Sequence, residues 1–419
     1  MLIQGKSPQS NSSAKPLPKG GPVDICTGPV DGFQASSYPC EWKPIKVIGS
    51  EPDPKAHFVS EAQFRQWMTD MPKAELHTHV EGAVRPQTIL DIAEEYKLPL
   101  PAPTVEELKV KIGMRQGEDL LAFLKKFDHF RFVFDQPETL QRLAYECIED
   151  NARENIQYTE LRINPRKNTE KVSIEQVLDS VLAGMDKAKK ELGVDGRLIA
   201  SINRSYPVES AMDIAKAAVA RKDRGIVGLD LAGDEVNHPA SKFAEVFDYA
   251  KANGLHLTVH AGEARGPESV LQAVELCHAE RIGHGVRLQE DPAAMQVIKE
   301  KGTVLEMCPE SNKLLNVTPD LKAYPLKTYM HYGIPVTINT DDRHIFDVDL
   351  SHEFTSLAKN IGLSLQDCQK VAMNAVEAAF LPAEEKAQLK QSFASQMQAF
   401  SSKLYQVSDA CASERPAAP

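Results

Sequence analysis

Two histidines stand one residue apart in the stretch Glu75-Leu76-His77-Thr78-His79-Val80-Glu81-Gly82, with carboxylates on either side. In a β-strand, residues i and i+2 point to the same face. If this stretch is a strand, both imidazoles aim into one space, which suits two ligands on one metal ion. Such pairs also occur by chance on protein surfaces, so the rest of the chain has to decide between the two interpretations.

The bulk composition describes an acidic globular protein. The chain has 419 residues, with 48 Lys and Arg against 59 Asp and Glu, and its net charge is −11. This balance argues against nucleic acid or an anionic membrane as the main partner. There is no apolar run of about 18 residues and no apolar signal-peptide core. The seven cysteines form no CxxC pair, so we expect a reduced, cytoplasmic protein, either a monomer or a weak homo-oligomer.

The order of expected elements predicts the fold. Residues 1–55 are rich in Ser, Pro, Gly and Lys and predict a disordered extension, while 408–419 predict a frayed tail. Residues 56–407 predict a single metal-dependent domain in which strands alternate with helices. The expected strands are 74–78, 156–163, 197–202, 226–231, 256–261, 281–282, 303–307 and 335–339. Eight βα units favour an α/β protein with a closed (β/α)8 TIM barrel and extra terminal helices.

An apolar insertion of helical period, about residues 100–135, follows the first expected strand. Its apolar positions include Leu120, Leu121, Phe123, Leu124, Phe127, Phe130 and Phe132. Two interpretations stay open, because core packing and a lid over an apolar ligand produce similar sequences.

Polar residues collect where the expected strands end. His77 and His79 end the first strand, and Asp230, His260, Glu263, His284, Asp341 and Asp342 follow at the ends of later ones. In a barrel all these ends share the face that carries the active site. Alternatives exist for single members, since Asp341 and Asp342 could cap the next helix and Asp230 could be structural. Coincidence at five strand ends favours a metal site.

The ligand types then narrow the metal. His77, His79, His260 and an aspartate offer nitrogen and oxygen without thiolate, which favours zinc in a catalytic site, although iron, cobalt or manganese could also bind. A metal-activated water would be the nucleophile. His284 could orient it, and Glu263 could carry a proton to the substrate.

From about residue 72 to 381 the chain resembles adenosine deaminases of the zinc-dependent amidohydrolase superfamily. The resemblance rests on the motifs Pro72-Lys73-Ala74-Glu75-Leu76-His77-Thr78-His79, Phe123-Leu124-Lys125-Lys126-Phe127-Asp128, Asp230-Leu231-Ala232-Gly233-Asp234-Glu235, His260-Ala261-Gly262-Glu263, Arg281-Ile282-Gly283-His284-Gly285 and Asn339-Thr340-Asp341-Asp342. It implies an enzyme of purine salvage that hydrolytically deaminates adenosine and 2′-deoxyadenosine, giving inosine or 2′-deoxyinosine and ammonia.

The resemblance also implies a role for each matching residue. One Zn²⁺ per chain would be held by His77, His79, His260 and Asp341. Glu263 would protonate purine N1, while His284 and Asp341 would position the water that attacks C6. The implied substrate contacts are His79, Glu81, Gly233 through its backbone at N3, Asp342 at N7, and the lid residues Leu120, Phe123, Leu124 and Phe127.

Glu81 departs from the family pattern. Adenosine deaminases usually carry Asp at this position, where it contacts the ribose, and relatives that act on free adenine typically carry Glu. The lid segment favours the nucleoside and Glu81 favours the base, so deamination of adenine or another aminopurine is the alternative. A barrel that binds a nucleoside without turnover is a remoter one.

Overall fold

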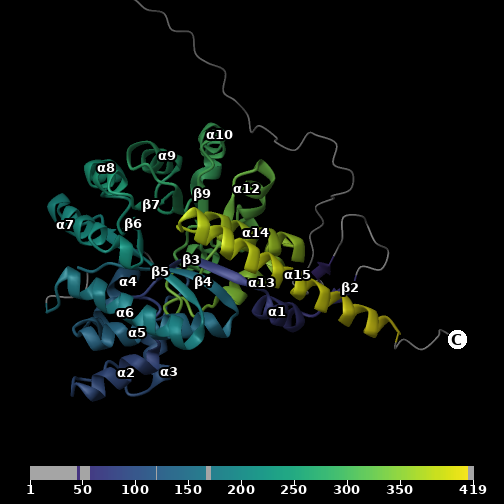
Figure 1. The fold of residues 1–419 in the computed structure, drawn as a ribbon, viewed down its shortest axis with the longest axis horizontal. Coiled ribbons are helices and arrows are strands. Elements are labelled where there is room, and N and C mark those ends of the chain that lie inside the picture. The colour runs from purple at the N-terminus through teal and green to yellow at the C-terminus, as the bar shows by residue number, and fades with distance from the viewer. Residues whose placement is uncertain (1–44, 48–56, 119, 167–170, 414–419) are drawn as a thin grey trace, which may run out of the picture. The chain divides into compact units, whose positions relative to one another are not determined.

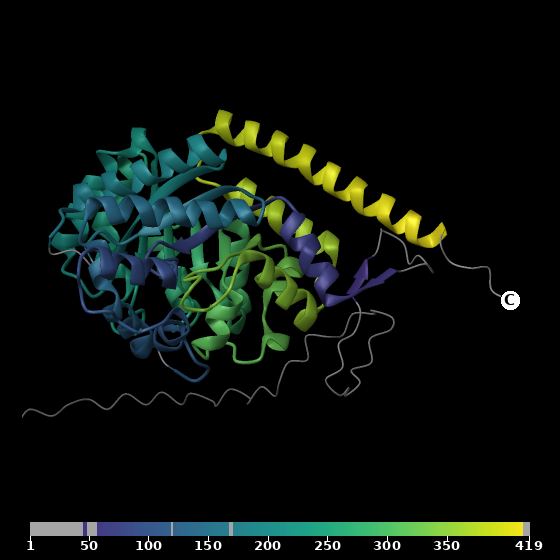
Figure 2. The ribbon, with the colours of Figure 1, turned by 90° about the horizontal axis from the view of Figure 1, so that it is seen from below.

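Eight parallel strands follow one another around a barrel (Figures 1 and 2). The computed structural model describes residues 45–47, 57–118, 120–166 and 171–413. The barrel strands are β3 Lys73–His79, β4 Ile156–Ile163, β5 Asp195–Asn203, β6 Ile226–Ala232, β7 His256–Ala261, β8 Arg281–His284, β9 Val304–Met307 and β10 Val336–Ile338. Each pairs in parallel with its neighbour in chain order, so the predicted (β/α)8 barrel is confirmed.

Helices surround the sheet because the strands are buried on both faces, and their outer side chains need cover from water. In β5, for example, Leu198, Ile199, Ala200 and Ile202 are all fully buried. The described α-helices are α1 Glu61–Asp70, α2 Pro86–Glu95, α3 Val105–Ile112, α4 Leu120–Lys126, α5 Pro137–Arg153, α6 Ile174–Leu192, α7 Val208–Val219, α8 Ala244–Ala252, α9 Pro267–Leu276, α10 Pro292–Lys301, α11 Pro309–Leu314, α12 Leu326–Tyr332, α13 Leu350–Ile361, α14 Leu365–Ala378 and α15 Ala383–Ser413. None of these described helices is both long and apolar enough to cross a membrane.

The barrel closes between its first and last strands, β3 and β10, next to His77 and His79. A parallel bridge joins Thr78 to Asp341, just beyond β10. The backbone N–H of Asp341 donates to the carbonyl of His77 at 2.9 Å, and that of His79 donates to the carbonyl of Asp341 at 3.0 Å. Side chains strengthen this seam, since Glu75 accepts from the backbone and hydroxyl of Thr340 at 3.1 and 2.9 Å. The seam therefore places the HxH strand directly beside Asp341.

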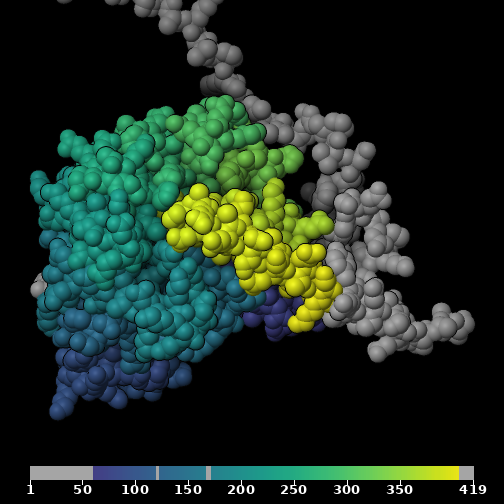
Figure 3. Space-filling view, viewed as in Figure 1, coloured from purple at the N-terminus to yellow at the C-terminus, as the bar shows by residue number. Residues whose placement is uncertain are grey.

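The helix α15 contacts the end of the barrel where the strands begin, and Figure 3 shows it lying across the outside of the domain. Arg197, near the start of β5, donates to Glu385 at 2.5 Å. Gln396 donates to Gln157, near the start of β4, at 3.1 Å. Because these contacts lie at the amino ends of the strands, the carboxyl ends are left for the site.

Three details differ from the sequence expectations. The short antiparallel strands β1 Ile45–Val47 and β2 His57–Val59 precede α1, and β1 falls inside the stretch expected to be disordered. The helix α15 continues to Ser413, past the expected start of a frayed tail. The strand expected over 281–282 continues to His284 in β8.

Candidate metal and active site

Strand β3 carries His77 and His79 to the mouth of the barrel. The His77 ring is fully buried and its Nδ1 lies 2.8 Å from Glu306 Oε2 on β9. With Nδ1–H donated to a carboxylate, Nε2 keeps its lone pair for another partner. His77 Nε2 is buried and has no hydrogen-bond partner among the described residues. A buried nitrogen whose lone pair has no hydrogen-bond partner is suited to bind a cation.

Three further donors converge on the same space. His260 Nε2 on β7 lies 3.2 Å from His79 Nε2. Asp341 Oδ1 lies 3.4 Å from His77 Nε2 and 3.5 Å from His79 Nε2. His260 Nδ1 is in turn 2.9 Å from Asp230 Oδ1, which orients the ring as Glu306 orients His77. One donor atom from each of His77, His79, His260 and Asp341 lies within 4.8 Å of the others, so the group could hold a metal ion.

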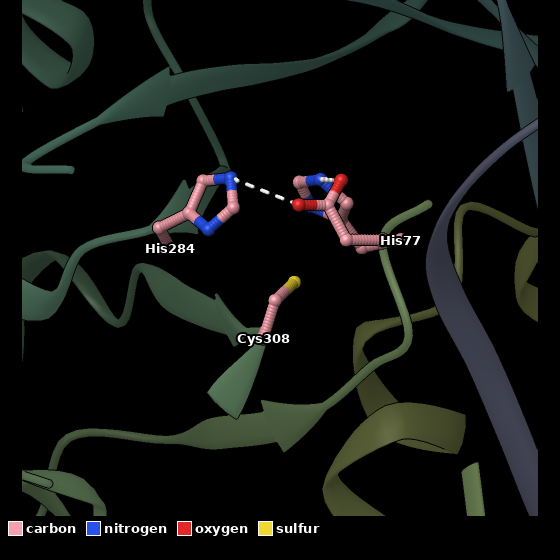
Figure 4. Close-up of side chains that lie close together, drawn as sticks. His77, His284 and Cys308 are labelled. Carbon is pink, nitrogen blue, oxygen red and sulfur yellow. Dashed lines mark ion pairs between the residues drawn. The ribbon is translucent and has the colours of Figure 1, made fainter. Parts of the chain in front are cut away.

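A second set of donors overlaps the first. His77, His284, Cys308 and Asp341 also lie close enough to bind a cation, and Figure 4 shows His77, His284 and Cys308 pointing toward a shared space. Burial keeps the pKa of the Cys308 thiol well above its usual value, and the nearby Asp341 carboxylate adds to this. Because a thiol binds metal only as thiolate, this environment favours the nitrogen and oxygen set predicted from the sequence.

The electrostatics of Asp341 suit a ligand carboxylate. Burial opposes its ionisation, but contact with His77 and the fields of His284 and His77 lower its pKa well below the usual value. Its backbone has φ of 60°, and that of His284 has φ of 66°. Both lie in the left-handed region that non-glycine residues rarely adopt, a strain that is common at functional sites.

His284 is held as a neutral imidazole. Its Nδ1 lies 3.1 Å from Asn312 Nδ2, and the Oδ1 of that amide accepts from the Tyr324 hydroxyl at 2.9 Å. The amide nitrogen therefore donates to Nδ1, which places the imidazole proton on Nε2. Burial lowers the pKa of His284 well below its usual value. Its Nε2 faces Glu263 Oε1 at 3.7 Å and Asp341 Oδ2 at 3.9 Å.

Glu263 is placed to act as an acid. Burial raises its pKa to about 8, and the Asp341 carboxylate adds to this effect. Its loop is held by Glu235, whose carboxylate accepts from the backbone N–H of Gly262 at 2.7 Å and of Ala264 at 2.7 Å. A carboxyl group that stays protonated near neutral pH can donate a proton to a bound base.

A cavity opens above these residues. Polar atoms line its depth and the apolar side chains of α4 line one wall. Close packing shapes its edge, since a Cβ at Gly82 would lie 1.9 Å from Asp342 Oδ1. The lining residues are His79, Glu81, Phe123, Leu124, Phe127, Asn164, Ser201, Asn203, Ala232, Gly233, His260, Glu263, His284, Leu315, Asp341 and Asp342.

The structure brings nearly all of the predicted site residues together. His77 lies beneath the cavity, and Glu81, Gly233, Asp342, Phe123, Leu124 and Phe127 line it. The side chain of Leu120, predicted to contact substrate, falls outside the described residues. Phe130 is fully buried and does not line the cavity. The insertion therefore supplies both a wall of the cavity and core packing, and its role as a lid stays a prediction.

The sequence did not reveal the residues that hold the site histidines in place. Glu306, which contacts His77, and Asn312 of helix α11, which contacts His284, received no role from the sequence. Arg162 was also missed. The available signal was charge inside expected strands, since Arg162 and Glu306 interrupt apolar runs. Asp230 was weighed as a structural acid, and its contact with His260 makes it a support for that ring.

Comparisons with known proteins agree with this geometry. The family model described as adenosine deaminase matches residues 72–396. The adenosine deaminase of Klebsiella pneumoniae strain 342 is 38% identical over 326 residues, covering 77% of this chain and 98% of that protein. The solved adenine deaminase of Arthrobacter aurescens is 28% identical with a TM-score of 0.73, covering 78% of this chain and 99% of that one. The Arabidopsis N6-mAMP deaminase is 27% identical with a TM-score of 0.69, over 79% and 99%. The motif resemblance is confirmed, and the chain belongs to the adenosine deaminase family.

Proposed function

We propose that this enzyme is a zinc-dependent hydrolase that converts adenosine and 2′-deoxyadenosine to inosine and 2′-deoxyinosine with release of ammonia. The proposal rests on one observation: the largely buried acid Glu263 lies close to the group of residues that could bind a metal ion. Glu263 lies 3.7 Å from His284, which lies 3.9 Å from Asp341 in the metal-binding group. Family membership supports the same reaction.

The residues proposed to hold one zinc ion are His77, His79, His260 and Asp341. Three imidazoles and a carboxylate suit zinc, and the open Nε2 of His77 supports a cation at this position. When bound, zinc would lower the pKa of a water molecule and so supply a nucleophile at neutral pH.

The proton steps fall to three side chains. Glu263, with its pKa raised to about 8, donates a proton to purine N1, which makes C6 electrophilic. His284 presents Nε2–H and Asp341 presents a carboxylate toward the same space, so they orient the attacking water and hold its proton. A C–O bond forms at C6 and the C–N bond breaks. The amino group takes up the proton held by Asp341 and leaves as ammonia, and the proton of the new C6 hydroxyl returns to Glu263.

Substrate contacts are proposed from the lining of the cavity. Asp342 faces purine N7, and the backbone of Gly233 faces N3. Gly233 has φ of 97°, and a Cβ there would lie 3.0 Å from Asn203 Oδ1, so only glycine leaves this approach open. Phe123, Leu124 and Phe127 cover the base as a lid. The partner is thus a small purine nucleoside, and neither nucleic acid nor a membrane is needed.

Adenine is the second candidate substrate because of Glu81. Its Oε1 accepts from the backbone N–H of Asn164 at 2.8 Å, and its side chain lines the cavity. The solved Arthrobacter aurescens relative is an adenine deaminase. A longer side chain than the usual Asp leaves less room for a ribose, which supports the smaller substrate. The apolar lid wall supports the nucleoside, which we favour.

The setting is proposed from the cysteines. Cys147, Cys277, Cys308 and Cys368 are free and buried, which suits a reducing compartment. We propose that the enzyme works in cytoplasmic purine salvage as a monomer or weak homo-oligomer.

Metal analysis and ammonia release test the proposal on the purified full chain. We expect one zinc ion per chain and ammonia release from adenosine. His79→Ala removes a proposed ligand and should lose both. His278→Ala is the matched control, because that histidine pairs only with the exposed Asp248 at 2.8 Å among the described residues, and it should retain both. Normal zinc and turnover in His79→Ala would contradict the metal site.

A further inference from the structure

Arg162 lies at the centre of the barrel, below the metal-binding group. It belongs to β4 and is fully buried. Its Nη2 donates to Glu306 Oε2 at 2.9 Å and to the backbone carbonyl of Leu76, next to His77, at 2.8 Å. Its Nη1 lies 3.5 Å from Asp230 Oδ1. One guanidinium thus hydrogen-bonds Glu306 and forms an ion pair without a hydrogen bond with Asp230, and these are the two carboxylates that support metal-facing histidines.

The contacts fall on the same oxygen atoms that the histidines use. Glu306 Oε2 faces His77 Nδ1 at 2.8 Å and Arg162 Nη2 at 2.9 Å. Asp230 Oδ1 faces His260 Nδ1 at 2.9 Å and Arg162 Nη1 at 3.5 Å. The second oxygens are held separately, by Thr258 on Glu306 at 3.2 Å and Ser201 on Asp230 at 2.7 Å. Both carboxylates are therefore fixed at each oxygen.

We infer that Arg162 is a positioning residue that sets the orientation of His77 and His260 together, and so tunes the affinity of the site for its metal. It touches neither substrate nor metal ligand atoms and acts through Glu306 and Asp230. This inference rests on the proposed metal centre and adds to it a residue shared by two of its ligands.

The chemistry of arginine explains the choice of residue. Two buried carboxylates need positive charge nearby, because an unpaired buried charge is strongly unfavourable. The planar guanidinium presents donors in a rigid fork and can contact two carboxylates and a carbonyl at once. A lysine ammonium is a single point and would reach one of the carboxylates at most. Fixing the outer partners of histidine ligands commonly changes metal affinity by about 10- to 100-fold.

Arg281 provides a matched control within the same barrel. It is equally buried and pairs with the same Glu306, at 2.6 Å, but through the other oxygen, Oε1. Its other hydrogen bonds go to Glu160 Oε2 at 2.6 Å and the carbonyl of Ala378 at 2.9 Å, and its guanidinium lies over the Phe380 ring. Removing Arg281 therefore also removes a buried positive charge, but leaves the oxygen atoms that face the histidines in contact with Arg162.

The test is a chelator-competition measurement of zinc affinity on the full chain, with thermal unfolding of the metal-free proteins as a measure of folding. We expect Arg162→Met to weaken zinc binding by about 10- to 100-fold, Arg162→Lys to show a smaller loss, and Arg281→Met to bind zinc as wild type does. Both methionine variants should lower the unfolding temperature.

Two results would overturn the inference: wild-type zinc affinity in Arg162→Met, or equal losses in Arg162→Met and Arg281→Met. If Arg162→Met does not fold, wild-type affinity in Arg162→Lys overturns it as well. Absence of zinc binding in the wild-type chain would instead remove the metal centre itself, so the two failures are distinguishable.

Discussion

The floor of the cavity and the lid beside it are built by different forces. The floor is formed by His77, His79, His260 and Asp341, and its outer ring atoms meet buried carboxylates at 2.8 and 2.9 Å. The lid helix α4 contributes apolar contacts. Phe123 stacks on Phe346 with ring centres 5.5 Å apart, and it forms a T-shaped pair with Phe127 whose ring centres are 5.3 Å apart.

This difference suggests that the floor determines the chemical step and that the lid determines substrate affinity. Hydrogen bonds and ion pairs are directional, so the floor holds each donor atom in one place. Apolar contacts are not directional, so the lid can change shape at lower free-energy cost. Changes in the floor and its acid should therefore lower kcat or metal affinity, whereas changes in the lid should raise KM.

The largest effect is expected from Glu263→Gln. The amide keeps the shape of the side chain but cannot donate a carboxylic proton to N1, so kcat should fall by about 10²- to 10⁴-fold. Bound zinc should be unchanged, because Glu263 is outside the proposed ligand set. Steady-state kinetics and metal analysis on the same preparation measure both. Wild-type kcat would remove Glu263 from the mechanism and weaken the contrast with the lid.

The pH profile of the wild-type enzyme tests the same acid without a substitution. Burial and Asp341 raise the pKa of Glu263 to about 8. A raised pKa means that the protonated form predominates below that pH and is lost as the pH rises through it. We expect kcat/KM for adenosine to fall above about pH 8, approaching tenfold per pH unit. A profile that rises over this interval would contradict the assignment.

A smaller effect is expected from Phe123→Ala in the lid. The side chain is 8% exposed and lines the cavity, so its loss should raise KM for adenosine by about tenfold, with kcat changed much less and zinc affinity unchanged. Phe132→Ala is the control, since Phe132 lies in the same segment but not among the residues lining the cavity. A drop in kcat with constant KM would show that the lid takes part in chemistry.

The smallest effect is expected from Glu81→Asp, which restores the residue typical of the family. Shortening the side chain withdraws the carboxylate from the cavity by one methylene. The ratio of kcat/KM for adenosine to that for adenine should rise by about tenfold or less, the size of one altered hydrogen bond. Initial rates with both substrates give the ratio. A fall in the ratio would mean that Glu81 itself contacts the ribose productively.

The two regions were unequally visible from the sequence. Strand alternation predicted the barrel, and the placement of His77, His260 and Asp341 at strand ends predicted the floor. Barrel topology makes such ends converge whatever their separation in the chain. Glu306 and Arg162 were not predictable as partners, because strand periodicity does not say which side chains of distant strands meet across a barrel interior.

The lid and loops were harder to interpret for a different reason. An apolar helical period is the same for a core helix and a lid, so the role of Phe123 needed the cavity to be seen. Leu315 lines the cavity from the residue after α11, and no local pattern marks it. Glu81 could be recognised from the sequence as a departure from the family pattern. Its hydrogen bond to Asn164 could not, because the two residues are distant in sequence and meet only in the folded chain.

The central proposal is that the cavity binds a nucleoside rather than a free base. The direct measurement is kcat/KM for adenosine, 2′-deoxyadenosine and adenine, determined side by side on zinc-loaded enzyme. We predict similar values for the two nucleosides, and a value at least about 100-fold lower for adenine, because the base alone forgoes the contacts of the sugar. Faster turnover of adenine than of adenosine would contradict the account and assign Glu81 to recognition of the free base.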